Sequence, residues 1–421
     1  MNLAFYLSSA LLALCILLIV WRPFRMPVVA PPVAGAAVLL LTGLTPPSAI
    51  ATVWGLVWDA TLTLLGLMVI SLVLDRGGFF RWCAGRIALA SGGNGKRAWW
   101  GLMLLAWATT AVLANDGAML ILVPIYAELL LRSGATRAQV YAFLFPVGFL
   151  IDVASTPLVT SNLTNIMAAD YFRLGFGEYA RLMALPSLVL GLAALGFGWL
   201  AFRAQVPERL SLSTAVAPRP RGLVFAAGWT ALAALGLGFG LAHVFHWPVC
   251  AVVGAVALGL LAVGLMAGEL ALVDVPRLTP WHIPVFALSL FVMVEAVART
   301  GGQHLLAETW LAVGPGLRPL SVGGTIGALS AGLNNLPALL LGLLSFGQAP
   351  EVATPAATAA SVVGANVAPK LTPYGSLATL LWMGLLGAKG FQVGWGEYMR
   401  HALRLTPPVL VLGLLAAWLI A

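Results

Sequence analysis

Four charged side chains lie inside long apolar stretches of this chain. Three are the carboxylates of Asp59, Asp116 and Asp152, and the fourth is the amine of Lys370. A charge in such a setting costs several kcal/mol unless it is paired or hydrated, and it is usually functional. Acids and a base in one buried site can exchange protons when its occupancy changes, so we predict that these four residues couple transport to protons. The alternatives are a static salt bridge for Lys370 and a hydrogen bond to a neighbouring helix for Asp59.

Polar sequences interrupt the apolar stretches next to these charges. The interruptions are residues 115–117, 152–165, 334–337 and 366–376. Non-helical backbone inside a membrane must be buried in protein or line water. We predict a substrate site from their side chains: Asn115, Ser155, Thr156, Ser161, Asn162, Asn165, Asn334, Asn335, Asn366, Thr372 and Ser376. These residue types also cap helix N-termini, so capping is an alternative role.

The composition indicates that membrane-spanning helices hold these residues. Hydrophobic residues make up 61% of the 421 positions and charged residues only 9%, and the mean hydropathy is +0.99. Soluble domains have about a quarter charged residues. The first apolar segment, 3–20, can span a membrane and has no basic residue before it, so we interpret it as a retained helix rather than a cleaved signal peptide. The predicted fold class is an all-α integral membrane protein.

The two halves of the chain resemble each other. The sequence GFGEYAR at 175–181 recurs as GWGEYMR at 394–400. Asn115-Asp116 is likewise followed much later by Asn334-Asn335. We predict two repeats, residues 1–203 and 222–421, joined by the polar linker 204–221. The polar residues of the GxGEY pair are not predicted to belong to the site.

Two apolar segments are too long for one helix and contain a polar break. They are residues 98–131 and 320–347, and we predict that each forms a re-entrant hairpin. The remaining segments give about ten transmembrane helices. With the N-terminus outside, most of the 22 Lys and Arg residues fall in loops predicted to be cytoplasmic. The halves are then inverted repeats and both termini are periplasmic, a pattern typical of secondary transporters whose site lies between the repeats.

Several classes of protein are excluded by the same sequence. The net charge of +8 comes from short loops between apolar spans, so we expect membrane lipid and no nucleic acid as a partner. Cys15, Cys83 and Cys250 are far apart, and they predict neither a disulfide nor a metal site. No arrangement of a nucleophile, a base and an oxyanion hole is visible. We therefore expect no enzyme activity, no metal and no cofactor.

Motifs along the chain resemble one family. They are SLVLDRGGFF at 71–80, ANDGA at 114–118, IDVASTPLVTSNLTN at 151–165 and PKLTPYGSLATLLW at 369–382. Together they resemble the bacterial arsenite efflux permeases, the arsenical pump membrane proteins of the ion transporter superfamily, over nearly the whole chain. The resemblance implies export of arsenite and antimonite across the bacterial inner membrane in exchange for protons, by alternating access. It also implies, in some hosts, an arsenite-stimulated ATPase partner.

One departure from that family bears on mechanism. Where the family is expected to have Gly-Cys-Asp, this chain has Gly364-Ala365-Asn366. Arsenite favours thiolates, but no cysteine lies near the interruptions. Arsenous acid is neutral at pH 7 and carries three hydroxyl groups, so amides and hydroxyls can bind it by paired donors and acceptors.

Two other functions fit the same pattern. The first is a sodium-coupled carboxylate transporter or sodium/proton antiporter of the same superfamily, and the second is a passive arsenite channel. A requirement for sodium, or competition by citrate or succinate, would favour the first. Efflux that is unchanged when the proton gradient is dissipated would favour the second.

Overall fold

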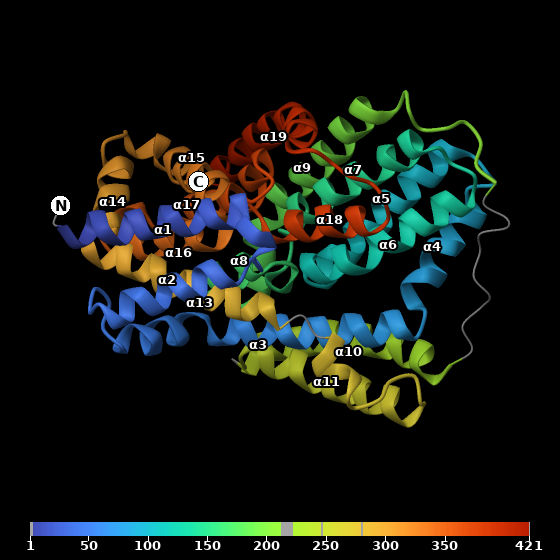
Figure 1. The fold of residues 1–421 in the computed structure, drawn as a ribbon, viewed down its shortest axis with the longest axis horizontal. Helices are drawn as coiled ribbons and strands as arrows, with labels where there is room; N and C mark the ends of the chain where they lie inside the picture. Colours follow the sequence, from blue (N-terminus) through green and yellow to red (C-terminus); the bar gives the residue numbers. More distant parts are fainter. Residues whose placement is uncertain (1–2, 212–221, 246, 279–280, 421) are drawn as a thin grey trace.

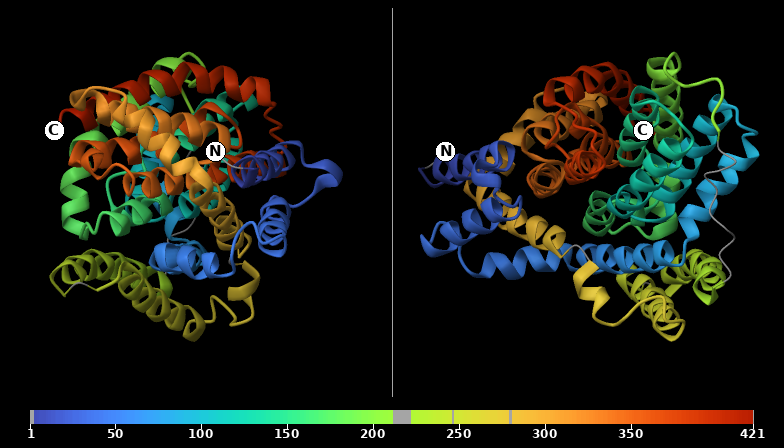
Figure 2. Two further views of the ribbon diagram at one scale, coloured as in Figure 1. Left: turned by 90° about the vertical axis from the view of Figure 1, so that its left-hand side faces the viewer. Right: turned by 45° about the vertical axis from the view of Figure 1, so that its right-hand side comes forward.

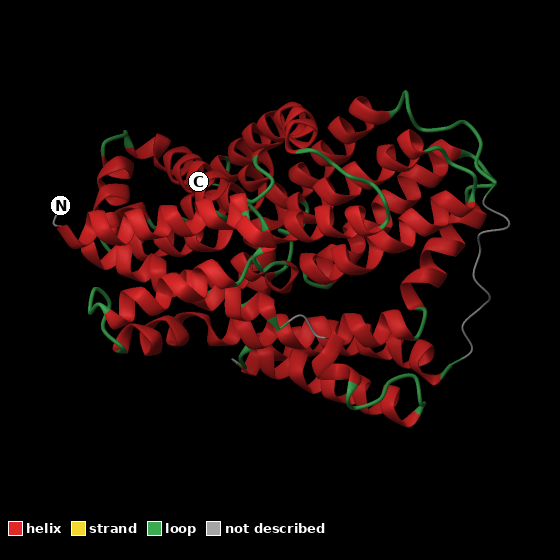
Figure 3. Cartoon of the chain, viewed as in Figure 1, coloured by secondary structure: helices red, strands yellow, loops and turns green. Residues whose placement is uncertain are grey.

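The computed structural model describes residues 3–211, 222–245, 247–278 and 281–420. The first half contains, in order, α1 (Leu3–Trp21), α2 (Ala30–Leu41), α3 (Ser48–Arg76), α4 (Phe79–Ala90), α5 (Gly95–Val112), α6 (Asn115–Arg132), α7 (Arg137–Val153), α8 (Leu163–Tyr171) and α9 (Phe176–Phe202). In the described residues all regular elements are helices, apart from an isolated bridge between Asn94 and Arg209 (Figure 3). Arg209 lies in the described part of the predicted linker, and residues 212–221 lie outside the described residues.

The second half runs through a similar series. It contains α10 (Leu223–Phe245), α11 (Val249–Met266), α12 (Asp274–Leu278), α13 (His282–Val297), α14 (Gln303–Leu311), α15 (Arg318–Leu333), α16 (Asn335–Phe346), α17 (Pro355–Val367), α18 (Leu377–Ala388) and α19 (Trp395–Trp418). A π-helical turn, Ala298–Gly302, joins α13 to α14. Apart from the short α12, each element of the first half therefore has a counterpart at the same place in the order.

Seven of the described helical segments are long and apolar enough to cross a membrane. They are α1, α3, α9, α10, α11, α13 together with α14, and α19. Three further predicted crossings are short or interrupted: α2 has 12 residues, and α7 with α8 and α17 with α18 are each broken in the middle. The all-α, multi-pass fold with broken helices that the sequence predicts is thereby confirmed.

The helices pack in two parts that face each other. α3, α10 and α11 lie side by side along one edge of the molecule (Figures 1 and 2). The larger part contains α5 to α9 and α15 to α19, and in it α9 packs against α19 and α6 against α18. The two halves of the chain therefore interlock, and the broken helices lie where they meet.

Both hairpins turn within one or two residues. α5 ends at Val112 and α6 begins at Asn115, so the extended residues Leu113 and Ala114 form the first turn. The second turn is Asn334 alone, at φ 96°, a value that few residues other than glycine adopt. The prediction that residues 115–117 and 335–337 are non-helical is wrong, because they form the first turns of α6 and α16. Acidic and amide side chains suit that position, where they face the positive end of the helix dipole.

Candidate functional site

Four helices begin in the region where the halves meet. They are α6, α8, α16 and α18, and each begins within or directly after an interruption predicted from the sequence. Asn162 caps α8 by accepting from the backbone N–H of Thr164 (3.2 Å), and Asn334 caps α16 by accepting from Leu336 (3.3 Å). α6 and α18 have no side-chain cap. Their first-turn N–H groups therefore remain available to a ligand or water.

A buried ion pair joins the two halves at this place. Lys370 Nζ lies 2.6 Å from Asp152 Oδ2, and the two side chains are only 2% and 3% exposed. Lys370 also donates to the carbonyl oxygen of Gly148 (3.0 Å) and to Thr379 Oγ1 (2.8 Å). All three N–H groups of the ammonium therefore have an acceptor.

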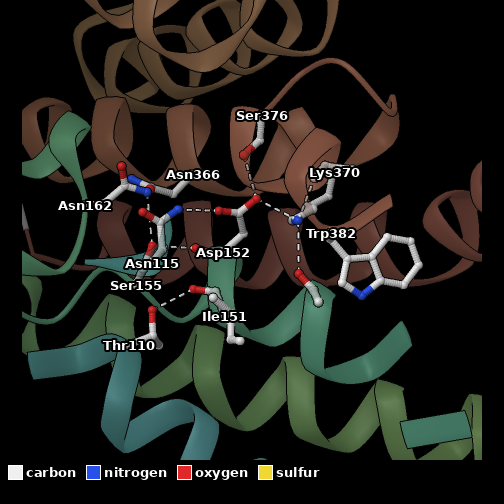
Figure 4. Close-up of polar contacts among 12 residues, drawn as sticks. Thr110, Asn115, Ile151, Asp152, Ser155, Asn162, Asn366, Lys370, Ser376 and Trp382 are labelled. Atoms are coloured by element: carbon white, nitrogen blue, oxygen red, sulfur yellow. Dashed lines mark hydrogen bonds and ion pairs between the residues drawn. The ribbon is translucent and has the colours of Figure 1, made fainter. Parts of the chain in front are cut away.

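The carboxylate of Asp152 also accepts hydrogen bonds from two side chains besides its ion pair with Lys370. Asn115 Nδ2 donates to Oδ1 (2.5 Å) and Ser376 Oγ donates to Oδ2 (2.7 Å). Figure 4 shows Asp152 between Asn115 and Lys370, with Ser376 reaching it from the second half. Ser376 uses its hydroxyl for this bond and does not cap its own helix. The ion pair is thus held by the side chains of Asn115 on α6, Ser376 in the break before α18 and Thr379 on α18.

A cluster of amides and hydroxyls lies beside the ion pair. Asn366 on α17 accepts from Asn162 Nδ2 (2.6 Å) and Thr164 Oγ1 (3.2 Å), and its own Nδ2 donates to Asn165 Oδ1 (3.2 Å). Ser155 connects this cluster to the ion pair, because its hydroxyl accepts from Asn162 Nδ2 (3.1 Å) and donates to the carbonyl oxygen of Asp152 (2.6 Å). Six of the eleven predicted substrate residues therefore form one continuous network across the two halves: Asn115, Ser155, Asn162, Asn165, Asn366 and Ser376.

Asp116 differs from Asp152 in having no hydrogen-bond donor. It lies in the first turn of α6 and is 8% exposed, and it makes no hydrogen bond or ion pair with any other described residue. Asp152 and Lys370 both act on it electrostatically. Asp116 is therefore the carboxyl group of the site that is free to change its protonation state without breaking a contact.

Other predicted site residues hold the backbone in place. Ser161 donates to the carbonyl oxygen of Ala111 (2.7 Å), and Thr372 donates to that of Ala331 (2.7 Å). Asn335 accepts at Oδ1 from the N–H of Leu336 (3.0 Å). The Ser161 and Thr372 bonds fasten the interruptions to the hairpins, whereas the Asn335 bond is local to the first turn of α16.

Thr156 is fully buried, and its hydroxyl has no hydrogen-bond partner among the described residues. It therefore remains available to a substrate.

Asp59 does not join the central network. Its carboxylate accepts from the backbone N–H groups of Val249 (3.2 Å) and Cys250 (2.7 Å) at the start of α11. This is the hydrogen bond to a neighbouring helix that the sequence left open as the alternative. The three cysteines lie on α1, α4 and α11, which contribute no residue to the network.

The GxGEY tyrosines contact the interruptions although the sequence interpretation left them out of the site. The hydroxyl of Tyr179 donates to the carbonyl oxygen of Thr156 (3.3 Å), and that of Tyr398 donates to the carbonyl oxygen of Lys370 (3.1 Å). The repetition of the GxGEY motif in both halves was the signal in the sequence that could have identified these tyrosines. Thr379 was also missed, although it lies inside the motif at 369–382.

The fold and this site define a multi-pass membrane protein with half-helices that meet at a polar centre. A solved structure with a similar fold is that of the YdaH transporter from Alcanivorax borkumensis, which matches with a TM-score of 0.57 and 15% sequence identity. The match covers 89% of this chain and 86% of that chain. At this identity the likeness shows the fold alone.

The sequence comparisons identify the family. The family model described as "Arsenical pump membrane protein" matches residues 7–420, so the chain belongs to this family. The arsenical pump membrane protein of Escherichia coli K12 is 35% identical over 97% of both chains. That of Yersinia enterocolitica is 36% identical over the same share. A putative arsenical pump membrane protein of Bacillus subtilis is 25% identical over 92% of this chain and 93% of its own.

Proposed function

We propose that this protein exports arsenite, as arsenous acid, and antimonite from the cytoplasm in exchange for protons. The proposal rests on one observation above all: a buried acid and base from opposite halves, Asp152 and Lys370, meet among the starts of four half-helices. Broken helices of this kind line the substrate sites of secondary transporters. The names of the relatives supply the arsenical substrate.

The network suits a small neutral solute with several hydroxyl groups. Arsenous acid can donate three hydrogen bonds and accept others, and the amides of Asn162, Asn165 and Asn366 offer both kinds of partner. Thr156 has an unused hydroxyl, and the uncapped starts of α6 and α18 offer backbone N–H groups. We propose that arsenous acid replaces hydrogen bonds within this network, which lets it be released again.

We assign the transported proton to Asp116. An ionised carboxylate without a partner is costly at this depth, whereas Asp152 is stabilised by Lys370, Asn115 and Ser376. In our scheme Asp116 gives its proton to the cytoplasm as arsenous acid binds, and it is protonated again from outside after release.

The scheme requires alternating access between two inverted repeats. We propose that residues 1–203 and 222–421 are these repeats, with both termini periplasmic in the bacterial inner membrane. The recurring order of helices and the interlocking of α6 with α18 support this proposal. The proposed exchange does not require a separate ATPase.

The test compares Asp116→Asn with Asp59→Asn, which removes a carboxylate outside the network. Radioactive arsenite uptake into everted vesicles is measured with an acidic lumen. A proton-motive force of about 100 mV is worth about 2.3 kcal/mol for each proton. Under that force we expect Asp116→Asn to lower arsenite accumulation about 50-fold. Asp59→Asn should retain proton-driven uptake in whatever protein folds. Full proton-driven uptake by Asp116→Asn would refute the assignment, and a requirement for sodium would refute the proposed coupling.

A further inference from the structure

A cavity of about 370 Å³ lies at the end of the molecule where α7 begins, α9 ends and α19 begins. Its lining includes Arg137, Tyr141, Gln205, Phe391, Glu397 and His401. In the proposed orientation these helix ends face the cytoplasm. The proposed substrate network contributes no residue to this cavity, so it calls for a separate explanation.

His401 forms the inner wall of this cavity. Its ring centroid lies 5.0 Å from those of Phe145 and Phe202 and 5.9 Å from that of Tyr141. The imidazole makes no hydrogen bond with another described residue, so both ring nitrogens are free to exchange a proton. Histidine is the side chain whose ordinary titration falls near neutral pH.

The charged groups around His401 come from two helices. Glu397, Arg400 and Arg404 act on it from its own helix, α19. Arg137, at the start of α7, lines the same cavity. Of these charged groups, Glu397 and Arg137 line the cavity and keep its wall polar.

Behind Phe145 lies a second, much smaller cavity of about 10 Å³. Its lining includes Phe145, Gly148, Lys370, Thr379, Trp382 and Tyr398, and Figure 4 shows Trp382 beside Lys370. A space of this size is about what one water molecule needs. It is too small for arsenous acid, so this route can pass a proton but not the substrate.

Tyr398 of α19 lines the small cavity but not the larger one. It lies one helical turn before His401, and its hydroxyl donates to the carbonyl oxygen of Lys370 (3.1 Å). Phe145 contacts both the His401 ring and the Tyr398 ring, with centroids 5.0 Å and 5.7 Å apart. An ionisable side chain facing the larger cavity and the buried ammonium therefore lie on the two sides of one aromatic layer.

We infer that this pair of cavities is the cytoplasmic exit for the transported proton, with His401 as its acceptor. The inference rests on the proposed proton exchange. Lys370 gives one N–H proton to water in the small cavity and regains one from Asp116, and this water passes its proton to a ring nitrogen of His401 when the Phe145 ring between them moves aside. The imidazolium then releases its proton to water in the larger cavity, which restores neutral imidazole.

The test uses the full-length protein in everted vesicles, whose outer face is the cytoplasmic one. His401→Gln keeps a polar side chain of similar size but cannot carry a proton, and His304→Gln on the exposed side of α14 is the matched control. Two rates are measured: arsenite uptake driven by an acidic lumen, and arsenite/arsenite exchange at equal pH, which needs no net proton transfer. Both are followed as the bath pH varies.

We expect His401→Gln to lower proton-driven uptake at least about tenfold and to flatten its dependence on bath pH between about 6 and 8. Arsenite exchange should stay within about twofold of the control, because no proton transfer limits it. Glu397→Gln, at the exposed rim of the cavity, serves as a second variant and should slow uptake in the same direction.

Two results would overturn the inference. One is proton-driven uptake by His401→Gln that matches His304→Gln in rate and pH profile. The other is an equal loss of both rates in both cavity variants, which would indicate a structural role. Absence of proton-driven uptake in the unmodified protein would instead refute the proposed function.

Discussion

The break between α7 and α8 and the break between α17 and α18 are fastened to their surroundings in the same way. In each, one hydroxyl donates to a carbonyl oxygen of the adjacent hairpin at 2.7 Å: Ser161 in the first and Thr372 in the second. In each, a tyrosine from the following long helix, Tyr179 or Tyr398, donates to a carbonyl oxygen of the break. The backbone supports of the two breaks therefore correspond.

The charges of the two breaks do not correspond. Asp152 ends the first broken helix, whereas the second carries Lys370. A backbone support serves its own half, so it can be present twice without conflict. Two carboxylates or two ammonium groups at the centre would repel each other in a medium that screens poorly. A two-fold arrangement of helices can therefore hold a central ion pair only if its two breaks carry opposite charges.

Removing the base Lys370 is the strongest test of the unequal charges in the two breaks. In Lys370→Met, Asp152 loses its cation while it remains buried, and we expect a loss of about 3–5 kcal/mol of stability together with transport. Thermal unfolding in detergent and vesicle uptake measure the two effects. Adding Asp152→Asn removes the unpaired charge, so the double variant should recover stability but not proton-driven transport. A single variant as stable as the unmodified protein would show that the ion pair is not formed.

The amide of Asn366 tests the cluster beside the ion pair. Its Nδ2 donates to Asn165 Oδ1 (3.2 Å) and to the carbonyl oxygen of Val362 (2.9 Å). In Asn366→Asp a carboxyl oxygen replaces the amide nitrogen and lies against the two oxygens that accepted its hydrogen bonds. This should lower the free energy of unfolding by about 1–3 kcal/mol and weaken arsenite binding. Asn366→Ala removes the repulsion as well as the bonds and is the control. Equal stability of the two variants would mean that the donor role of the amide is unimportant.

The smallest effects are expected from the two matching supports. Ser161→Ala and Thr372→Val each remove one hydrogen bond to a hairpin carbonyl, and the loss of that bond should cost about 1 kcal/mol of stability in each variant. Ser161→Ala also removes the longer bond that the hydroxyl accepts from the Leu158 N–H (3.3 Å). Thermal unfolding of both variants measures whether the breaks are equally supported. A loss several times larger in one variant would contradict the correspondence between the halves.

Much of the architecture could be predicted because it depends on local sequence. Apolar segments of sufficient length predicted the spans, and the polar interruptions located the breaks to within a few residues. The hairpin turn before Asn115 was misplaced because Asn and Asp suit both a loop and the first turn of a helix. The buried charges and amides were identified from their cost in an apolar setting.

The pairing of these residues could not be predicted. Nothing local distinguishes Asp59, which holds the start of α11, from Asp116 in the central site, because both are carboxylates within apolar stretches. The role of Tyr398 likewise depends on where α19 lies relative to Lys370. Such contacts join residues far apart in the chain.

The sequence by itself determined that this protein is an all-helical, multi-pass membrane protein with four polar interruptions in its apolar stretches, since these properties follow from hydrophobicity and from polar residues at each position. The tertiary structure decided which charges meet. It paired Asp152 with Lys370, left Asp116 without a donor and brought His401 and Lys370 to opposite sides of one aromatic layer. The reason is physical: the cost of burying a charge depends on its own surroundings, whereas its compensation depends on a partner that only the packing of the two halves brings into contact.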